Sequence, residues 1–464
     1  MPFQDRLQFC VRKLSEWGGD KFQRFGKRRK ELCDLIQRVR KRRDEEGCQI
    51  LNKADKELSK LLDQEDIYSK QRAKQHWLCA GDRNTRFFHQ YASYRRRKNQ
   101  IHGLMAPNGK WCEGPNLMSL VRDNYNSLFH SNGAANSGFL DSLTPCISVE
   151  QNTGLLRPFE ESEVNEALFT MHPDKSHGPD GMNPGFYQKS WETVGSDVTQ
   201  FVLKCIKECL FSDGMNDTTL VLIPKKQTPK TVADLRPIAL CNTTYKTISK
   251  MVANRLKPLL QHVISDNQFA FLPGRLISDN ILLAVEMGHY LHRKQLGLTG
   301  WVGLKLDMAK AYDRVEWGFL RKMMEKLGFD SRWIELVMLY ELVPTRGLRQ
   351  GDPLRPYLFI LCVEGLSLML KEAERKRLIH GIRVARGAPP VTHLFFADDS
   401  LLFFKASDEE AGQVRQPLAS VFVVVQAENF GGWNLEVVQS LFCPRDMDQI
   451  SRVPLQLDSE DKWY

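Results

Sequence analysis

The chain has 464 residues, of which 42% are hydrophobic and 26% are charged, as in ordinary globular proteins. No run approaches the roughly 18 consecutive apolar residues of a membrane-spanning helix, and no apolar signal segment follows the N-terminus. We therefore predict no membrane association and no secretion, and an intracellular location by exclusion. The eleven cysteines are scattered without a Cys-x-x-Cys pair, which argues against a disulfide framework and a zinc knuckle.

The net charge of +9 is unevenly distributed. Residues 1–110 contain 27 Lys and Arg against 14 Asp and Glu, a net +13, and the remainder contains 38 against 42, a net −4. A basic front end suits a polyanionic partner. A solvated helical face has the same composition, so charge alone leaves both interpretations open.

Residues 1–75 are predicted to be helical, because apolar residues recur at near-helical spacing among Lys, Arg, Glu and Gln. Two basic clusters, 27–30 and 40–43, lie in this region. They fit either nuclear import or RNA binding, or simply an exposed helix. A nuclear location is one expectation.

Residues 77–99 interleave aromatic rings with arginines, a composition that suits single-stranded nucleic acid, whose bases stack and whose phosphates pair with cations. An aromatic mini-core with a charged rim would look the same. The candidate nucleic-acid ligands are Arg83, Arg86, Arg95, Arg96, Arg97 and Lys98.

Further along, an abundance of Ser, Asn, Gly and Pro predicts a linker over 131–158, and Gly and Pro predict a tight loop over 175–181. Helical periodicity then predicts a helix over 186–210. From residue 218 short apolar strands alternate with helices, which predicts an α+β body. The expected strands are 219–224, 302–307, 394–397 and 401–404, and the expected helices are 244–262, 310–327 and 356–377.

Three acids lie where strands end. Asp307 follows one apolar strand, and Asp398 and Asp399 are predicted to form the two-residue turn of a hydrophobic hairpin. Such turns normally favour Asn-Gly or Asp-Gly, and two adjacent carboxylates repel each other unless a cation neutralises them. Carboxylate oxygens are ligands that Mg²⁺ prefers, and two such ions about 4 Å apart can stabilise the attacking and leaving oxygens of a phosphoryl transfer. A simple polar turn is the alternative.

Several segments in order resemble the reverse-transcriptase family, specifically the LINE-type (non-LTR) retrotransposon branch of plant genomes. The segments are 222–226 (LIPKK), 234–240 (DLRPIAL), 267–275 (NQFAFLPGR), 307–315 (DMAKAYDRV), 346–354 (RGLRQGDPL) and 396–399 (FADD). Upstream, 81–89 (GDRNTRFFH) and 178–181 (GPDG) also resemble this branch, so the resemblance covers roughly 70–405.

The resemblance implies an α+β right-hand polymerase with fingers and palm. An antiparallel palm sheet would be backed by helices, and a mainly helical basic N-terminal region would precede it. The implied divisions are 1–110, 111–215 and 216–464. The implied activity is RNA-directed DNA synthesis, in which dNTPs are added to the 3′-hydroxyl of a DNA primer on an RNA template. No oligomeric state is implied.

The resemblance also implies roles for individual residues. Asp307 and Asp398 would bind two Mg²⁺ ions, with Mn²⁺ as an alternative, helped by Asp399 and the backbone carbonyl of Met308. Tyr312 would exclude a ribose 2′-hydroxyl. The triphosphate and the nucleotide or template pocket would contact Lys225, Arg236, Arg349, Gln350 and Gly351, whereas Asn267, Gln268, Phe269 and Gly274 would be structural or template-facing.

Three departures from the family pattern predict impaired activity and a degenerate, truncated fragment. The hairpin expected before Pro344 is missing, Val437 stands where a lysine is usual, and no thumb precedes the end at Tyr464. The alternative function is an inactive remnant that at most binds RNA through 1–110. A group II intron maturase has less support, because 81–89 points to the retrotransposon branch.

Overall fold

The computed structural model describes residues 3–23, 25–42, 44–73, 85–131, 140, 143–293, 300–307, 310–340 and 346–415. Helices and antiparallel strand pairs are both present in these ranges, which agrees with the predicted α+β class. Among them no helix is long and apolar enough to cross a membrane.

The chain divides into two compact units. The first comprises Met1–Val121, Met171–Val198 and Thr218–Thr243, and the second comprises Arg122–Thr170, Thr199–Asp217 and Thr244–Tyr464. The contiguous three-part division expected from the sequence stays a prediction.

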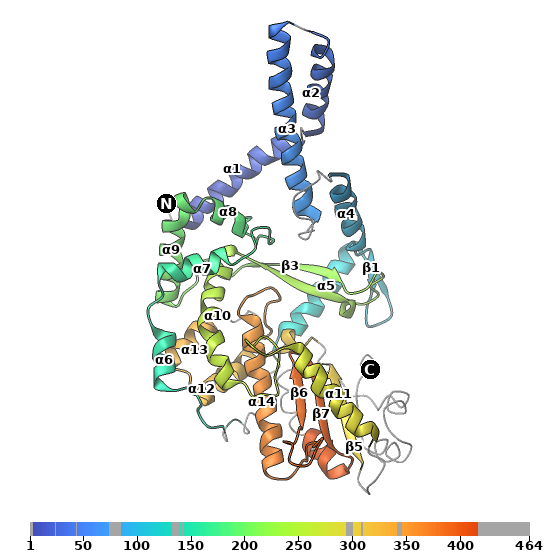
Figure 1. Ribbon diagram of the computed structural model, residues 1–464, viewed down its shortest axis with the longest axis vertical. Coiled ribbons are helices and arrows are strands. Elements are labelled where there is room, and N and C mark those ends of the chain that lie inside the picture. The colour runs from blue at the N-terminus through green and yellow to red at the C-terminus, as the bar shows by residue number, and fades with distance from the viewer. Residues whose placement is uncertain are drawn as a thin grey trace. The chain divides into compact units, whose positions relative to one another are not determined.

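The first unit begins with four helices. They are α1 (Phe3–Gln23), α2 (Phe25–Val39), α3 (Glu45–Ala73) and α4 (Thr85–Lys98). Helices α2 and α3 form a hairpin (Figure 1) in which arginines of the 27–30 cluster meet acids of α3. Arg28 Nη2 lies 2.6 Å from Glu57 Oε1, and Arg29 Nη1 lies 3.2 Å from Glu65 Oε2. Two cations of that cluster are therefore already paired within the helical hairpin.

The strands of the first unit form two antiparallel hairpins. They are β1 (Gly103–Met105) with β2 (Trp111–Glu113), and β3 (Thr218–Pro224) with β4 (Leu235–Cys241). The second hairpin is closed by a short 3-10 helix, η2 (Val232–Asp234). The Asp234 carboxylate accepts hydrogen bonds from the backbone N–H groups of Lys230 and Thr231, which fixes the turn.

The predicted tight loop at 175–181 packs against the end of β4. A Cβ at Gly178 would lie 2.4 Å from the backbone N of Asn242, so only glycine allows this approach. The side-chain oxygen of Asn242 accepts from the backbone N–H of Asp180 over 3.0 Å. Helix α8 (Pro184–Lys189) follows the loop.

In its described residues, the second unit is mostly helical around one sheet. Its helices are α6 (Val149–Leu156), α7 (Glu161–Phe169), α11 (Ile277–Arg293), α12 (Trp317–Leu327), α13 (Ser331–Met338), α14 (Arg355–Arg375) and, from its second residue on, α10 (Thr243–Val263). Helices α5 (Gly114–Phe129) and α9 (Trp191–Glu208) contain unit boundaries. The predicted linker over 131–158 is wrong at its C-terminal end, where α6 forms. Ser148 and Gln151 build a reciprocal capping box there, which satisfies the first N–H groups of that helix.

The predicted helix over 310–327 is interrupted. Ala311–Arg314 is a 3-10 helix (η3), and α12 begins only at Trp317. The reason is a long-range pairing: the carbonyls of Tyr312 and Val315 accept from Leu348 and Gly347, over 2.8 and 2.7 Å. Those carbonyls are therefore used by a later segment instead of by a continuous α-helix.

The sheet of the second unit has three antiparallel strands in the order β5-β7-β6. They are β5 (Trp301–Asp307), β7 (Asp399–Lys405) and β6 (His393–Phe396). Helices α11 and α14 lie beside these strands (Figure 1), with α11 contacting β5 and β6. Met287 of α11 packs with Leu394 and Phe403 in a buried cluster, and Ser367 of α14 is hydrogen-bonded to His393. Helices therefore back the sheet that carries the acids.

Candidate active site

The three predicted acids gather at one end of the sheet. Asp307 is the last residue of β5 and Asp399 the first of β7, and their backbones are paired in register. Asp398 immediately precedes Asp399. The side chain of Asp307 lies outside the described residues. The Asp399 carboxylate is exposed and lies 3.8 Å from Lys305 Nζ, a weak, solvent-screened pair.

The turn that carries Asp398 differs from the sequence expectation. Phe396 pairs with Asp399, so the two-residue turn is Ala397–Asp398, not Asp398–Asp399. Ala397 has φ = +57°, a left-handed conformation at the position where such hairpins favour glycine. A residue with a Cβ adopts it at a cost of about 1–2 kcal/mol, so surrounding contacts must hold the turn in place.

Gln268 supplies one of those contacts. Its buried side-chain oxygen accepts from the backbone N–H of Ala397, at 3.1 Å, and from that of Ala270, at 2.9 Å. The surrounding segment pairs with β6, since Phe269 N donates to Phe395 O over 3.0 Å. The sequence indicated only a structural or template-facing residue at 268. Its support of the Asp398 turn depends on this pairing, which no local pattern reveals.

Tyr312 lies in a cluster of rings and charges in the second unit. Its ring stacks on Phe359 with centroids 4.0 Å apart and planes at 25°, and the Arg355 guanidinium carbon lies 4.0 Å from the same centroid. Burial, together with the charge of Asp398, raises the pKa of the Tyr312 hydroxyl. Burial lowers the pKa of Arg355. Arg355 lies just outside the 346–354 motif and is not among the residues predicted from the sequence.

The segment with Arg349, Gln350 and Gly351 follows the strand-like contacts at Gly347 and Leu348, so it is tied to the Tyr312 region. The Arg349 guanidinium lies 4.9 Å from the centroid of the Tyr245 ring. Gly351 has φ = +112°, which glycine alone adopts readily.

Asp352 fixes the end of this segment. Its carboxylate accepts from the Tyr245 hydroxyl at 2.6 Å, from the Ser249 hydroxyl, and from the backbone N–H of Leu354 at 2.9 Å. Because Leu354 is the residue before α14, the buried carboxylate joins the start of that helix to α10. The loop before α14 is therefore anchored at both ends.

The predicted absence of a hairpin before Pro344 falls partly on residues 341–345, which lie outside the described part of the chain. Between α13 and α14, the described residues 339–340 and 346–354 contain one isolated bridge, Glu316 with Arg346, and no strand. The described segments therefore contain no hairpin strand here.

The predicted triphosphate ligands lie in the first unit. Lys225 and Arg236 are exposed residues at the closed end of the β3–β4 hairpin, where Ile223 pairs with Arg236. The backbone N–H of Lys225 donates to Asp234 O over 2.8 Å. Met308 and Arg83 lie outside the described residues.

Helix α4 presents the predicted nucleic-acid ligands. Its exposed cations are Arg86, Arg96, Arg97 and Lys98. Arg95 is half-buried and donates to Ala73 O over 3.1 Å. Phe88 is 3% exposed and Tyr94 49%, so α4 has both an inward aromatic residue and an outward one. The buried ring fits the aromatic mini-core, and the exposed ring and cations fit single-stranded nucleic-acid binding.

The carboxylates at the sheet end have the chemistry of a Mg²⁺ site, since hard divalent ions prefer oxygen ligands. Asp398 and Asp399 are adjacent, and Asp307 is paired with Asp399 along the backbone. Among the described side chains, which exclude Asp307, no group of three or more His, Cys, Asp or Glu could hold a metal ion. The backbone register brings the positions of the three acids to one end of the sheet.

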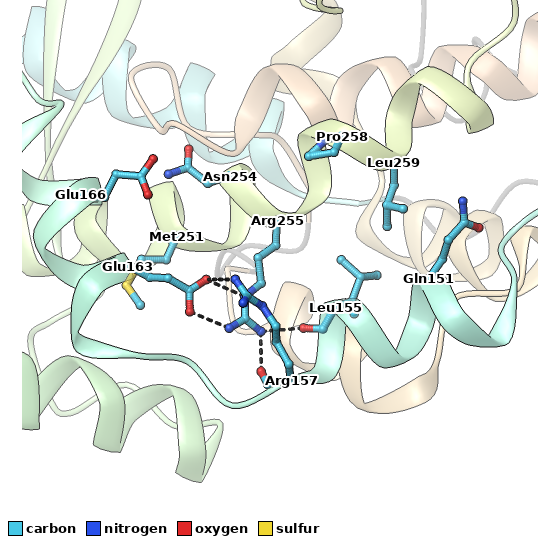
Figure 2. Close-up of a pocket in the computed structure, with 11 residues that line it drawn as sticks. Gln151, Leu155, Arg157, Glu163, Glu166, Met251, Asn254, Arg255, Pro258 and Leu259 are labelled. Atoms are coloured by element: carbon cyan, nitrogen blue, oxygen red, sulfur yellow. Dashed lines mark hydrogen bonds and ion pairs between the residues drawn. The ribbon is translucent and has the colours of Figure 1, made fainter.

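A pocket of about 400 Å³ elsewhere in the second unit contains none of the predicted site residues. Figure 2 shows Arg255 at its wall, held by both Glu163 carboxylate oxygens, at 2.8 and 2.7 Å, and by the carbonyl of Leu155 at 2.8 Å. The guanidinium also lies 3.4 Å from the centroid of the Phe159 ring. These hydrogen bonds link Arg255 of α10 to Leu155 of α6 and Glu163 of α7, so the side chain has a structural role.

Comparison with known proteins gives the family. Residues 223–434 match the family described as reverse transcriptase (RNA-dependent DNA polymerase). The chain contains a reverse-transcriptase domain of the LINE type. The resemblance seen in the motifs is thereby confirmed, whereas the plant-like branch and the truncation stay predictions.

Relatives extend the likeness beyond the matched domain. The chain is 29% identical over 394 residues to an uncharacterised 149 kDa protein of transposon TX1 from Xenopus laevis. It is 27% identical over 275 residues to the Pol polyprotein of retrotransposable element R2 from Nasonia vitripennis, and 54% identical over 59 residues to an uncharacterised mitochondrial protein of Arabidopsis thaliana. These alignments cover 80%, 53% and 13% of this chain, and 29%, 24% and 48% of the respective relatives.

Proposed function

We propose that the chain acts as an RNA-directed DNA polymerase, which adds deoxynucleotides to a primer 3′-hydroxyl on an RNA template. The main support is the backbone register that brings Asp307 level with Asp399, beside the Ala397–Asp398 turn, at the end of one antiparallel sheet. In this proposal the β5-β7-β6 sheet is the palm, and the β3–β4 hairpin belongs to the fingers.

Asp307, Asp398 and Asp399 would hold two Mg²⁺ ions, or Mn²⁺, with the Met308 carbonyl as a further ligand. When bound, such ions lower the pKa of a hydroxyl nucleophile and stabilise charge on a leaving pyrophosphate. In this proposal the chain positions the acids: Gln268 holds the turn before Asp398, and the pairing of β5 with β7 sets the spacing of Asp307 and Asp399 along the sheet.

Around the acids, the proposal gives Tyr312 the role of excluding a 2′-hydroxyl, and gives Gln350 and Gly351 contacts with the nucleotide. Lys225 and Arg236 are proposed ligands of the triphosphate, because guanidinium and ammonium groups donate well to phosphate oxygens. Arg349 and the cations of α4 are proposed to contact the nucleic-acid strands, since phosphate contacts provide most sequence-independent affinity.

A primer-extension assay tests this function. The full chain is incubated with poly(rA)–oligo(dT), Mg²⁺ and dTTP, and Asp398→Asn is run beside the wild type. Extension that disappears in Asp398→Asn would support the proposal. No extension by a wild-type protein shown to be folded by circular dichroism would favour the alternative, an inactive remnant that binds RNA.

A further inference from the structure

We propose that Arg355 is a positioning residue for sugar selection: it holds the Tyr312 ring in one orientation and so determines how strictly ribonucleotides are rejected. This rests on the proposed function, in which Tyr312 meets the sugar of the incoming nucleotide. Neither the motifs nor the family comparison gives Arg355 a role.

The Tyr312 ring is held from both faces. Phe359 stacks on it at 4.0 Å with the planes at 25°, so that ring covers one face. The Arg355 guanidinium carbon lies 4.0 Å from the same centroid, over the ring, and must therefore cover the opposite face. A flat, delocalised guanidinium is well suited to stack on an aromatic face. What remains for a sugar is the edge of the ring with its hydroxyl.

The two groups that hold the ring are fixed to one rigid element. Arg355 and Phe359 are four residues apart in α14, so their side chains lie on the same side of the helix. Phe359 is fully buried. The start of α14 is fastened by the bond from Leu354 N to Asp352. The backbone of Tyr312 is held by the bond that its carbonyl accepts from Leu348.

Arg355 stands where local rules disfavour it. It is the first residue of α14, and the N-terminus of a helix carries positive partial charge that repels a cation. Its Nε is buried and has no hydrogen-bond partner among the residues that the structure describes. Its favourable surroundings are the Tyr312 ring and the charges of Asp313, Asp352 and Asp398. Residues that break local rules are expected at functional sites.

The test compares dTTP with 5-methyluridine triphosphate, which differs from dTTP only by the 2′-hydroxyl. The measured quantity is the selectivity ratio, kcat/KM for dTTP divided by kcat/KM for 5-methyluridine triphosphate, on poly(rA)–oligo(dT) with Mg²⁺. The proteins are the full-length wild type, Arg355→Ser, Arg355→Lys and Tyr312→Ala, with Arg375→Ser as a matched control. Arg375 is an exposed arginine in the last turn of the same helix, paired with Glu372.

We expect Arg355→Ser to lower the ratio by about tenfold, the effect of a modest decrease in differential binding, mainly by raising kcat/KM for the ribonucleotide. Arg355→Lys keeps the charge but removes the flat surface and should give an intermediate ratio, while Arg375→Ser should match the wild type. Arg355→Ser removes a cation from the first turn of α14, where the helix dipole disfavours positive charge, so the variant should fold, which circular dichroism checks.

An unchanged ratio in folded Arg355→Ser, with a lowered ratio in Tyr312→Ala, would overturn the role of Arg355. A lower KM for dTTP at an unchanged ratio would also overturn it, because Arg355 would then obstruct the nucleotide. If the wild type does not extend primers, the proposed function fails, and Kd values for the two nucleotides are compared by calorimetry with primer–template and Mg²⁺. Equal Kd ratios in wild type and Arg355→Ser, or no nucleotide binding at all, would then overturn the inference.

Discussion

The side-chain oxygen of Gln268 accepts a hydrogen bond from the backbone N–H of Ala397, 129 positions later, at 3.1 Å. Ala397 has φ = +57° and directly precedes Asp398. This bond compensates part of the cost of the left-handed turn residue, which is about 1–2 kcal/mol. The position of Asp398 thus depends on a buried amide in a distant segment.

Replacement of Gln268 by methionine keeps the side-chain length but removes the acceptor for two backbone N–H groups. We expect the free energy of unfolding to fall by at least about 1–3 kcal/mol, the cost of leaving a buried donor unpaired. In primer extension, kcat should fall and the half-saturating Mg²⁺ concentration should rise, with KM for dTTP unchanged. Urea titration and a Mg²⁺ series measure these effects.

Asn280→Leu is the matched control for Gln268→Met. Its side-chain amide donates to Phe395 O over 3.1 Å, so it supports β6 without contacting the turn. We expect a comparable decrease in stability with no change in the Mg²⁺ dependence. A Gln268→Met protein with wild-type Mg²⁺ dependence would contradict the positioning role of Gln268.

Glu364 of α14 lies in a buried polar network that extends to His393, the first residue of β6. Its carboxylate accepts from the backbone N–H and hydroxyl of Ser265, both at 3.0 Å, and Ser265 and His393 both bond to Ser367. Burial raises the pKa of Glu364 to about 7 and lowers that of His393 to about 3. Lys371 and Arg275 are the cations that partly offset the shift of Glu364.

The raised pKa makes stability depend on pH in a defined direction. The folded state favours the protonated Glu364, so its contribution is full below the unfolded value of about 4.5 and is lost as pH rises to about 7. The decrease is of order 3 kcal/mol, from about 1.4 kcal/mol per pKa unit. The difference in unfolding free energy between Glu364→Gln and wild type should therefore grow in favour of the variant between pH 5 and 7. A difference that is constant across this range would refute the prediction.

The sequence predicted the strands that carry the acids more accurately than the contacts that support them. Strand β5 and the hairpin of β6 and β7 lie close to the expected ranges, because their apolar runs are short and bounded. The turn was placed one residue late, since its register is set by pairing of Phe396 with Asp399. The roles of Gln268 and Arg355 depend on contacts with residues far along the chain, which no periodicity records.

Helix α4 offers a test of nucleic-acid binding apart from catalysis. We expect the triple change of Arg96, Arg97 and Lys98 to alanine to weaken binding of single-stranded RNA. The slope of log affinity against log salt concentration is negative, and its magnitude should decrease by about 0.7 for each RNA phosphate that the variant no longer neutralises. Fluorescence anisotropy with a labelled RNA at several salt concentrations gives both quantities.

The control for this triple change removes the same charge from another helix. Lys53, Lys56 and Lys60 are exposed on α3 and are not among the individual residues proposed to contact the nucleic-acid strands. Their triple alanine variant should retain the wild-type slope. Equal slopes for both triple variants would mean that α4 has no special role, and that only net charge matters.

The most direct test of the polymerase assignment is the single-turnover rate of dTTP addition on poly(rA)–oligo(dT) with Mg²⁺. Wild type is compared with Asp398→Asn and with Asp408→Asn, an exposed aspartate beyond the end of β7. We predict a decrease of about a thousandfold or more for Asp398→Asn, from several kcal/mol of missing transition-state stabilisation, and a wild-type rate for Asp408→Asn. A wild-type rate in folded Asp398→Asn would contradict the assignment of the active site to the Asp307, Asp398 and Asp399 cluster.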